Sequence, residues 1–170
     1  IIEKISSYKA GCWGSGVLRQ EYLQRGDHDL NPHMEAPKTS KPAAVLIPLI
    51  RHKAEMTVLL TQRASHLKDH ASQISFPGGR IETRDVGYEA TALRETEEEI
   101  SLSRDRVEVI GRLDTYMTRT GFEVTPVVAF VKPPIRVKPD PREVAAIFEV
   151  PLSFLMDRIK AGIRAGGGVP

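Results

Sequence analysis

The sequence has a single cysteine, Cys12, and no apolar run near the roughly 18 residues that a membrane-spanning helix needs. One cysteine excludes an internal disulfide and fits a reducing compartment, so we expect a cytoplasmic protein with no membrane partner. Cys12 lacks the surroundings of a nucleophile and is interpreted as incidental. The 24 basic and 22 acidic residues leave a net charge of +2, which gives no electrostatic case for a nucleic-acid partner.

The length of 170 residues and the hydrophobic content of 41% favour one globular domain. Residues 1–41 are interpreted as an N-terminal helix and a polar arm that belong to the same domain as residues 42–160. Residues 161–170 form a Gly-rich end. Because the chain has no initiator Met, either end is a candidate truncation point.

Apolar periodicity predicts strands separated by one long central helix. The predicted strands are Ala43–Ile50, Thr57–Thr61, Val107–Leu113, Val124–Val131 and Ala145–Val150. The central helix should run from about Asp85 to Ile100, with Val86, Ala90, Leu93 and Ile100 on its core side. Shorter helices are predicted over Val17–Gln24 and from Pro151 to about Ala161, where Pro stands at the favoured first position.

Three carboxylates of the central helix fall on one patch. Glu95, Glu98 and Glu99 stand at i, i+3 and i+4, which places them within about 5–6 Å of one another, turned toward a cleft. Like charges this close repel, and a divalent cation such as Mg²⁺ would offset the repulsion. Arg94, four residues before Glu98, can fix the rotamer of that carboxylate. A solvated acidic face is the simpler interpretation of such a run taken alone.

The segment upstream of the carboxylates favours a functional site over a solvated face. Phe76-Pro77-Gly78-Gly79 predicts a tight turn at which the backbone can approach a ligand closely. This turn would bring main-chain carbonyls beside the carboxylate patch.

The two features together resemble the box of the Nudix hydrolases, which reads Gly, five residues, Glu, seven residues, then Arg-Glu-apolar-any-Glu-Glu-any-Gly-apolar. The Arg-Glu-x-x-Glu-Glu core is intact from Arg94 to Glu99. Four features depart from the pattern: Asp85 stands for Glu, one extra residue precedes Arg94, Thr96 replaces an apolar residue and Ser101 replaces Gly. Because Gly at the last position supplies the left-handed residue that ends the helix, Ser101 predicts a slightly different helix exit.

A second resemblance points to one branch of that family, the coenzyme A pyrophosphatases. Residues 59–79 are similar to the branch signature Leu-Leu-Thr-x-Arg-Ser/Ala-x-x-Leu-Arg-x-His-x-Gly-Gln-x-x-Phe-Pro-Gly-Gly, with Lys68 for Arg and Ser72 for Gly. Asp85 and the extra residue also fit this branch. Residues 118–128 and 143–155 resemble two further branch motifs, so the similarity covers roughly residues 42–157.

The resemblance implies an α/β fold, the Nudix α/β/α sandwich with a mixed sheet and a central catalytic helix. It implies that Glu95 and Glu99 are the principal ligands of Mg²⁺ or Mn²⁺, helped by a backbone carbonyl of Gly78 or Gly79. Glu98 would be a further ligand or the base that deprotonates water. The resemblance thus assigns the metal to Glu95, Glu99 and Glu98, and the chemistry to Glu98, Glu95 and Arg94.

The reaction of that branch is hydrolysis of coenzyme A, a small-molecule nucleotide, to 3′,5′-ADP and 4′-phosphopantetheine. The substrate-binding candidates are Arg63, Lys68, His70, Gln73, Gly78 and Gly79. Arg63 stands at the named Arg and is the main candidate for the extra 3′-phosphate. An exposed solubilising charge is the simpler interpretation of Lys68, Arg80, Arg84 and Arg119, and a structural hydrogen bond that of His70.

Two other functions stay open on the sequence alone. One is a Nudix hydrolase of another diphosphate, such as ADP-ribose or a dinucleoside polyphosphate. The other is a non-catalytic nucleotide-binding module, against which the intact carboxylate cluster argues. The oligomeric state is left open.

Overall fold

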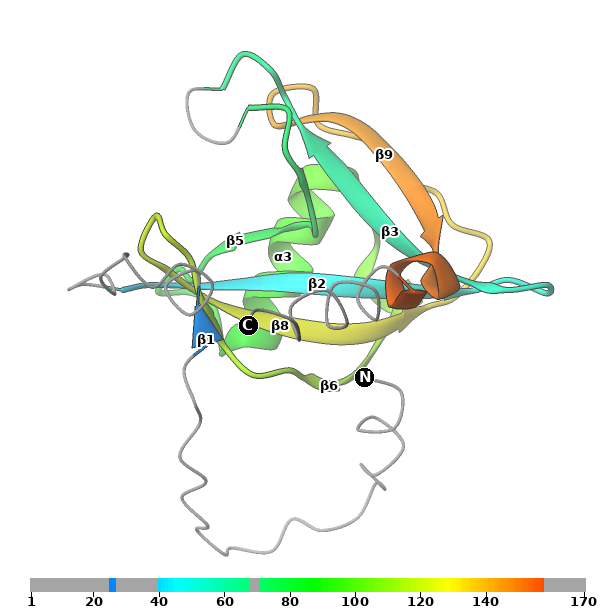
Figure 1. Ribbon diagram of the computed structural model, residues 1–170, viewed down its shortest axis with the longest axis horizontal. Helices are drawn as coiled ribbons and strands as arrows, with labels where there is room; N and C mark the ends of the chain where they lie inside the picture. The colour runs from blue at the N-terminus through cyan, green and yellow to red at the C-terminus, as the bar shows by residue number, and fades with distance from the viewer. Residues whose placement is uncertain (1–24, 27–39, 68–70, 158–170) are drawn as a thin grey trace, which may run out of the picture.

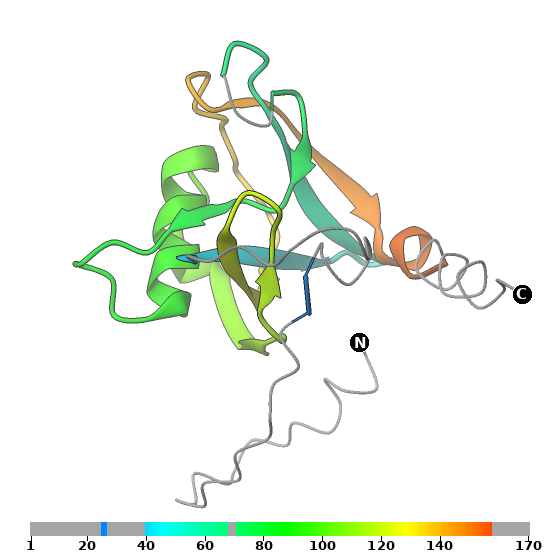
Figure 2. The same ribbon diagram turned by 60° about the vertical axis from the view of Figure 1, so that its left-hand side comes forward.

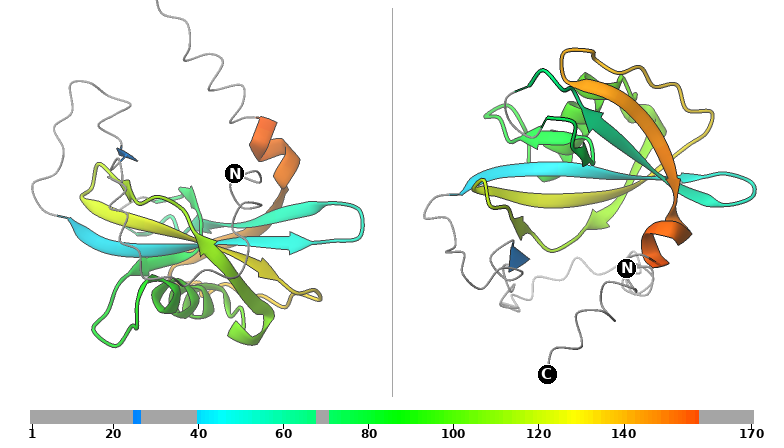
Figure 3. Two further views of the ribbon diagram at one scale, coloured as in Figure 1. Left: turned by 90° about the horizontal axis from the view of Figure 1, so that it is seen from below. Right: turned by 45° about the horizontal axis from the view of Figure 1, so that its top comes forward.

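The computed structural model describes residues 25–26, 40–67 and 71–157, which form one mixed sheet with helical structure on both faces (Figure 1). Helix α3 (Tyr88–Ile100) covers one face. A helical segment, residues 152–157, lies on the opposite face, as Figures 2 and 3 show. The predicted α/β/α sandwich is therefore confirmed. No helix in these residues is long and apolar enough to cross a membrane.

Nine strands make up the sheet within the described residues: β1 (Arg25–Gly26), β2 (Lys41–Arg51), β3 (Met56–Arg63), β4 (Ile74–Ser75), β5 (Gly78–Arg80), β6 (Val107–Arg112), β7 (Tyr116–Met117), β8 (Phe122–Val131) and β9 (Val144–Pro151). Their order is β1-β7-β8-β2-β3-β4, with β5 beside β2, β6 beside β8 and β9 beside β3. The β1–β7 and β2–β8 pairs are parallel and the others antiparallel. The sheet is mixed, as the sequence predicted.

Strand β2 organises the sheet because its two edges are used differently. Strand β8 pairs along one edge from Lys41 to Ile50. The other edge is shared: β5 pairs with Ala43–Val45, and β3 pairs with Leu49–Arg51. Strands β3 and β9 therefore diverge from the β5 side, and β5 crosses α3 (Figure 1). This split brings Gly78 and Gly79 over the helix that carries the carboxylates.

Two apolar clusters hold the layers together. The larger one lies between the sheet and α3 and contains buried residues from β2, β3, β8 and the helix: Ala44, Leu46, Ile50, Leu59, Ala92, Ile100, Val127 and Val131 among others. The smaller one lies on the opposite face, where Leu152 and Leu155 of the helical segment pack against Leu49, Val58 and Val128. Burial of these Val, Ile and Leu side chains is the main force that stabilises both layers.

All five predicted strands are present, but the start of the central helix was predicted wrongly. Helix α3 begins at Tyr88 rather than Asp85, and Val86, expected on the core side, is 92% exposed. Gly87 has a φ of 91°, which departs from helical geometry. Asp85 instead closes a turn: its backbone N–H donates to Glu82 O over 3.0 Å, and its Oδ2 accepts from Glu82 N–H over 2.9 Å.

The core side of α3 also differs from the prediction. Ile100 is fully buried and Leu93 packs against the core, as expected, whereas Ala90 is only half-buried. The buried positions that the prediction missed are Thr91, Ala92, Arg94 and Thr96. Three of these are polar, so a pattern of apolar residues could not indicate them.

Two further predicted boundaries are wrong. Gly78-Gly79, predicted as a turn, belongs to strand β5, because glycine lets this backbone lie flat against Ala44 and Val45 of β2. Pro151 ends strand β9 opposite Thr57, so the helical segment starts one residue later. The sequence also missed the two-residue strands β1, β4 and β7. The predicted helix Val17–Gln24 lies outside the described residues.

Both serines that replace a family glycine adopt left-handed backbone. Ser101 has φ 56° and ψ 28° at the end of α3, and Ser72 has φ 61°. They are the only non-glycine residues with positive φ in the described chain. The expected change of helix exit is therefore wrong: the left-handed exit is kept, and Ser101 N–H donates to Glu97 O over 2.9 Å. The serine Cβ makes this conformation strained.

We predict that Ser101→Gly raises the free energy of unfolding by about 0.5–1 kcal/mol, because relief of the left-handed strain exceeds the extra backbone entropy that glycine brings to the unfolded chain. Urea unfolding measures the change. Ser101→Ala is the matched control, since it keeps the Cβ of an exposed side chain and should gain nothing. Equal gains in both variants would contradict the strain at this position.

Candidate active site

The guanidinium of Arg94 lies at the centre of the carboxylate patch. Only 5% of the residue is exposed. It donates five hydrogen bonds of 2.9–3.0 Å: Nε and Nη2 to the two oxygens of Asp85, Nη2 to Arg80 O, and Nη1 to Glu95 Oε1 and Glu98 Oε2. An arginine has five N–H donors, so its bonding capacity is used in full. The expected contact with Glu98 is present, and it is one of several.

Asp85 orients Arg94 from the loop before the helix. Its side chain is 4% exposed, and Thr91 Oγ1 donates to its Oδ2 over 3.0 Å. The hydrogen bonds from Arg94 hold the pKa of Asp85 well below its ordinary value, and burial only partly opposes them. The sequence indicated Asp85 only as a departure from the box. A buried arginine requires a buried carboxylate, and that signal appears only once Arg94 is known to be buried.

Glu95 and Glu99 lie directly against the two glycines of β5. Gly78 N–H donates to Glu99 Oε2 over 3.1 Å. A Cβ on Gly79 would stand 2.5 Å from the carboxyl carbon of Glu95. The backbone therefore approaches the carboxylates closely, as the sequence predicted, but it comes from a strand rather than a turn and presents the Gly78 N–H to Glu99 rather than a carbonyl.

Burial disfavours the ionised form of the Glu95 and Glu99 carboxylates. It raises the pKa of Glu99 to about 8; the Gly78 N–H opposes the rise, and the charges of Glu95 and Glu143 add to it. Burial also raises the pKa of Glu95, against the effect of Arg94 and with that of Glu98 and Glu143. Half-buried carboxylates that repel one another favour the binding of a divalent cation, which takes carboxylate oxygens as ligands.

Glu143 is a site residue that the sequence-based prediction missed. The segment before β9 passes the end of α3, where Asp140 N–H donates to Glu99 O and Lys138 N–H to Ile100 O, each over 2.8 Å. It then reaches Glu143, whose carbonyl accepts from Ala64 N–H over 2.8 Å at the end of β3. Glu143 begins the 143–155 resemblance but stands in no acidic cluster, so the sequence did not indicate that its charge acts on Glu95 and Glu99.

Glu98 faces two arginines rather than the other two carboxylates. Its Oε2 accepts from Arg94 and its Oε1 from Arg84 Nη2 over 3.2 Å. Among the described residues, no group of three Asp, Glu, His or Cys side chains already converges as a metal site. Glu95 and Glu99 therefore lie together beside β5, whereas Glu98 would have to give up a contact with an arginine before it could bind a cation together with them.

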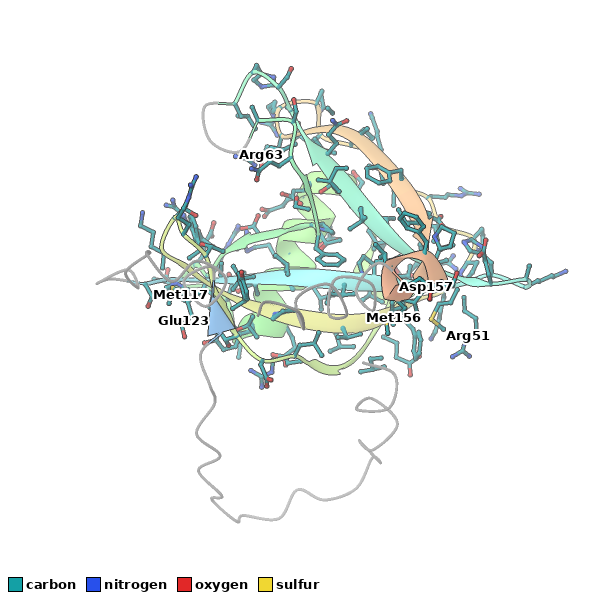
Figure 4. The ribbon with its side chains drawn as sticks, viewed as in Figure 1. Arg51, Arg63, Met117, Glu123, Met156 and Asp157 are labelled. Carbon is teal, nitrogen blue, oxygen red and sulfur yellow. The ribbon has the colours of Figure 1, made fainter. Side chains whose placement is uncertain are left out.

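The predicted substrate-binding residues fall into two groups. Arg63, at the end of β3, lies on the side of the sheet where α3 and β5 lie (Figure 4), and its charge lowers the pKa of Glu99 against the effect of burial. Arg63 N–H donates to Gln73 O over 2.9 Å, so the two signature residues are adjacent. Lys68 and His70 lie outside the described residues.

A model of the NUDIX domain matches residues 40–164, nearly all of the described chain. The chain belongs to the Nudix hydrolase family. It is 46% identical over 113 residues to the uncharacterized Nudix hydrolase NudL of Enterobacter sp. (strain 638), covering 66% of this chain and 58% of that protein. NudL of Shigella flexneri serotype 5b is 44% identical over 117 residues, which cover 69% of this chain and 60% of that protein. The chain thus spans less than two thirds of the length of these curated relatives.

Solved Nudix structures share the fold. The Nudix hydrolase RenU from M. smegmatis has a TM-score of 0.59 at 19% identity, covering 78% of this chain and 90% of its own. A C. elegans Ap4A hydrolase complex has a TM-score of 0.58 at 18% identity, covering 73% and 98%. The Nudix domain of Shewanella oneidensis NrtR, complexed with ADP ribose, has a TM-score of 0.52 at 21% identity, covering 77% and 85%. At these identities the likeness shows the fold alone.

Nudix hydrolases cleave diphosphates and generally use divalent metal ions such as Mg²⁺ or Mn²⁺. The residues of this Nudix domain fit such an ion, since Glu95 and Glu99 supply half-buried carboxylate oxygens and the absence of a side chain at Gly79 lets the Glu95 carboxylate lie against β5.

We predict that the two adjacent glycines fail in different ways when changed to alanine. A Cβ on Gly79 meets the movable end of Glu95, so Gly79→Ala should fold but bind Mn²⁺ at least about tenfold more weakly. A Cβ on Gly78 meets the Ala44 carbonyl oxygen at a φ of 151°, so Gly78→Ala should cost about 3 kcal/mol of stability. Thermal unfolding and Mn²⁺ titration separate the two effects, and a Gly79→Ala protein with normal Mn²⁺ affinity would contradict the placement of Glu95.

We also predict that Glu99→Gln lowers turnover by at least about a hundredfold while raising the melting temperature of the metal-free protein by about 2–4 °C at pH 8. The Glu99 pKa is raised from 4.5 to about 8, so folding loses stability as the pH rises between these values, and the amide removes that loss. The gain should shrink toward pH 5.

The matched control is Glu97→Gln, which changes an exposed carboxylate of the same helix that pairs with Arg104. It should alter neither turnover nor the pH dependence of melting. A Glu99→Gln protein that melts several degrees lower, or keeps activity within about threefold, would exclude the ligand role.

Proposed function

We propose that the protein is a divalent-metal-dependent Nudix pyrophosphohydrolase that cleaves the diphosphate of coenzyme A or its derivatives to 3′,5′-ADP and 4′-phosphopantetheine. The observation that carries the substrate is the position of Arg63. The arginine of the coenzyme A signature stands at the end of β3, where its backbone N–H donates to Gln73 O over 2.9 Å and its charge lowers the pKa of Glu99 against the effect of burial. The coenzyme A signature, through Arg63, therefore lies near the carboxylates of the Nudix box. In this proposal a diphosphate and the groups on either side of it would be bound there together. On the single cysteine we also propose a cytoplasmic location.

In this proposal Glu95 and Glu99 hold the metal, and the backbone of Gly78 and Gly79 lies beside it. A divalent ion there would neutralise diphosphate charge and lower the pKa of water. A carboxylate of the cluster accepts a proton from the attacking water, which adds to one phosphorus as the bridging P–O bond breaks. Arg94 keeps the carboxylates in position throughout, because none of its donors is free to move to the substrate.

A second candidate is hydrolysis of another nucleoside diphosphate derivative. The fold is shared with an Ap4A hydrolase and with a domain complexed with ADP ribose, and the carboxylates and glycines of the site contact no group that only coenzyme A possesses. Under this alternative Arg63 would bind a phosphate common to all these compounds.

A hydrolysis panel decides between the two. Purified protein is supplied with Mg²⁺ or Mn²⁺ and with coenzyme A, oxidised coenzyme A, ADP-ribose, NADH and a dinucleoside polyphosphate, and the products are identified. Release of 3′,5′-ADP with the highest kcat/KM supports the proposal. Preference for ADP-ribose or the dinucleoside polyphosphate supports the second candidate, and binding without hydrolysis would indicate a non-catalytic module.

We predict that Arg63→Ala raises KM for coenzyme A about tenfold or more and leaves KM for dephospho-coenzyme A nearly unchanged. A charge-assisted hydrogen bond to the 3′-phosphate contributes roughly 1.5–3 kcal/mol, and only the first compound carries that group. An equal slowing of both compounds that spares ADP-ribose would place the contact on the pantetheine side. A uniform loss across every diphosphate would exclude a specific role for Arg63.

A further inference from the structure

Arg84 stands at the edge of the carboxylate cluster with an exposed guanidinium. Its Nε lies 2.7 Å from Glu82 Oε2 and its Nη2 3.2 Å from Glu98 Oε1, and 63% of its side chain is exposed. The turn closed between Glu82 and Asp85 sets its backbone. Arg84 thus bridges a loop carboxylate and a helix carboxylate on the solvent side of the site.

The two oxygens of Glu98 have partners of very different strength. Oε2 accepts from Arg94, whose side chain is 6% exposed and held by four other hydrogen bonds. Oε1 accepts only from Arg84 among the described residues, and both side chains of that pair are more than half exposed. Exposed ion pairs contribute little to stability, so the Arg84 contact is the one that can be given up. Oε1 is therefore the oxygen that Glu98 can offer to a cation.

We propose that Arg84 is an exchangeable partner of Glu98: it holds Oε1 while no metal is bound, yields that oxygen to the divalent ion, and then binds a phosphate of the substrate. The inference rests on the proposed function, since it assumes a metal and a diphosphate at this site. A divalent ion carries twice the charge of the guanidinium and takes carboxylate oxygens as ligands. The freed guanidinium offers paired N–H donors that match phosphate oxygens.

The geometry favours Arg84 over the other arginines near the box. Arg94 has no spare donor, and the Arg80 guanidinium lies over the ring of Phe122, with 5.0 Å between Cζ and the ring centroid. Glu82 would keep Arg84 at the site after Glu98 is lost, because its contact is to Nε, a different donor from the Nη2 that contacts Glu98. The exchange needs only a rotation of exposed side chains.

The first test is titration of the metal-free protein with Mn²⁺ by calorimetry. If Arg84 competes with the ion, Arg84→Ala should bind Mn²⁺ about twofold to fivefold more tightly than the wild type. Arg84→Lys keeps the charge and should stay near the wild type. The matched control is Arg104→Ala: Arg104 is another exposed arginine, with Nε 2.8 Å from Glu97 Oε2 on the outer side of the same helix, and its loss should leave Mn²⁺ affinity unchanged.

The second test is titration of the Mn²⁺-loaded proteins with α,β-methylene-ADP, a diphosphate that cannot be cleaved between its phosphorus atoms. Arg84→Ala should bind it about tenfold more weakly, whereas Arg104→Ala should match the wild type. One substitution thus tightens the metal and weakens the diphosphate. A merely structural role for Arg84 would shift both affinities in the same direction.

The proposal is overturned if Arg84→Ala leaves Mn²⁺ affinity unchanged or lower, or if it leaves the affinity for α,β-methylene-ADP unchanged. It is also overturned if Arg104→Ala reproduces both shifts, since the effect would then be general electrostatics. Neither titration requires turnover. A wild-type protein that binds Mn²⁺ and the analogue but hydrolyses no compound of the panel would contradict the proposed function and leave the exchange standing.

Discussion

The site depends on one buried cation. Arg94 joins the loop before α3, strand β5 and two carboxylates of the helix through a single guanidinium. Removing it would leave Asp85 buried without its counter-charge and would free Glu95 and Glu98 from their common donor, which is among the costliest changes a buried charge network can undergo. The same group that stabilises the fold therefore also sets the positions of the carboxylates that are proposed to bind the metal.

Four residues that depart from the family pattern, Asp85, Thr96, Ser72 and Ser101, still make the contacts or adopt the backbone conformation that the pattern implies. Asp85 reaches Arg94 with both oxygens although its side chain is shorter than glutamate. Thr96 fills an apolar position because its Oγ1 donates to Ala92 O over 2.7 Å and leaves no unpaired polar atom in the core. Ser72 and Ser101 take the left-handed backbone of the glycines they replace and carry the strain. Backbone geometry is thus retained where side-chain identity is not.

The layers could be predicted from the sequence, whereas much of the site could not. Apolar strands such as Ala43–Ile50 are indicated by composition alone, and the i, i+3, i+4 spacing is enough to predict that the glutamates share one side of the helix. The short strands depend on partners distant in sequence: Gly78-Gly79 becomes a strand only because β2 offers a free edge. The contact of Asp85 with Arg94 and the involvement of Glu143 were missed for the same reason, since both residues lie in loops whose paths no local pattern encodes.

The electrostatics of the metal-free site explain why a diphosphate enzyme would keep such an arrangement. One Arg94 guanidinium faces the carboxylates of Asp85, Glu95 and Glu98, and none of its five hydrogen bonds goes to the half-buried Glu99. Burial is the main cause of the raised pKa values of Glu95 and Glu99, and the charges of neighbouring carboxylates add to it, so keeping both groups ionised costs stability. That cost is the same interaction that attracts a divalent ion, because the ion relieves it. A better-balanced cluster would fold more stably and bind metal less tightly, so the strain at the site and its affinity for the cation rise together.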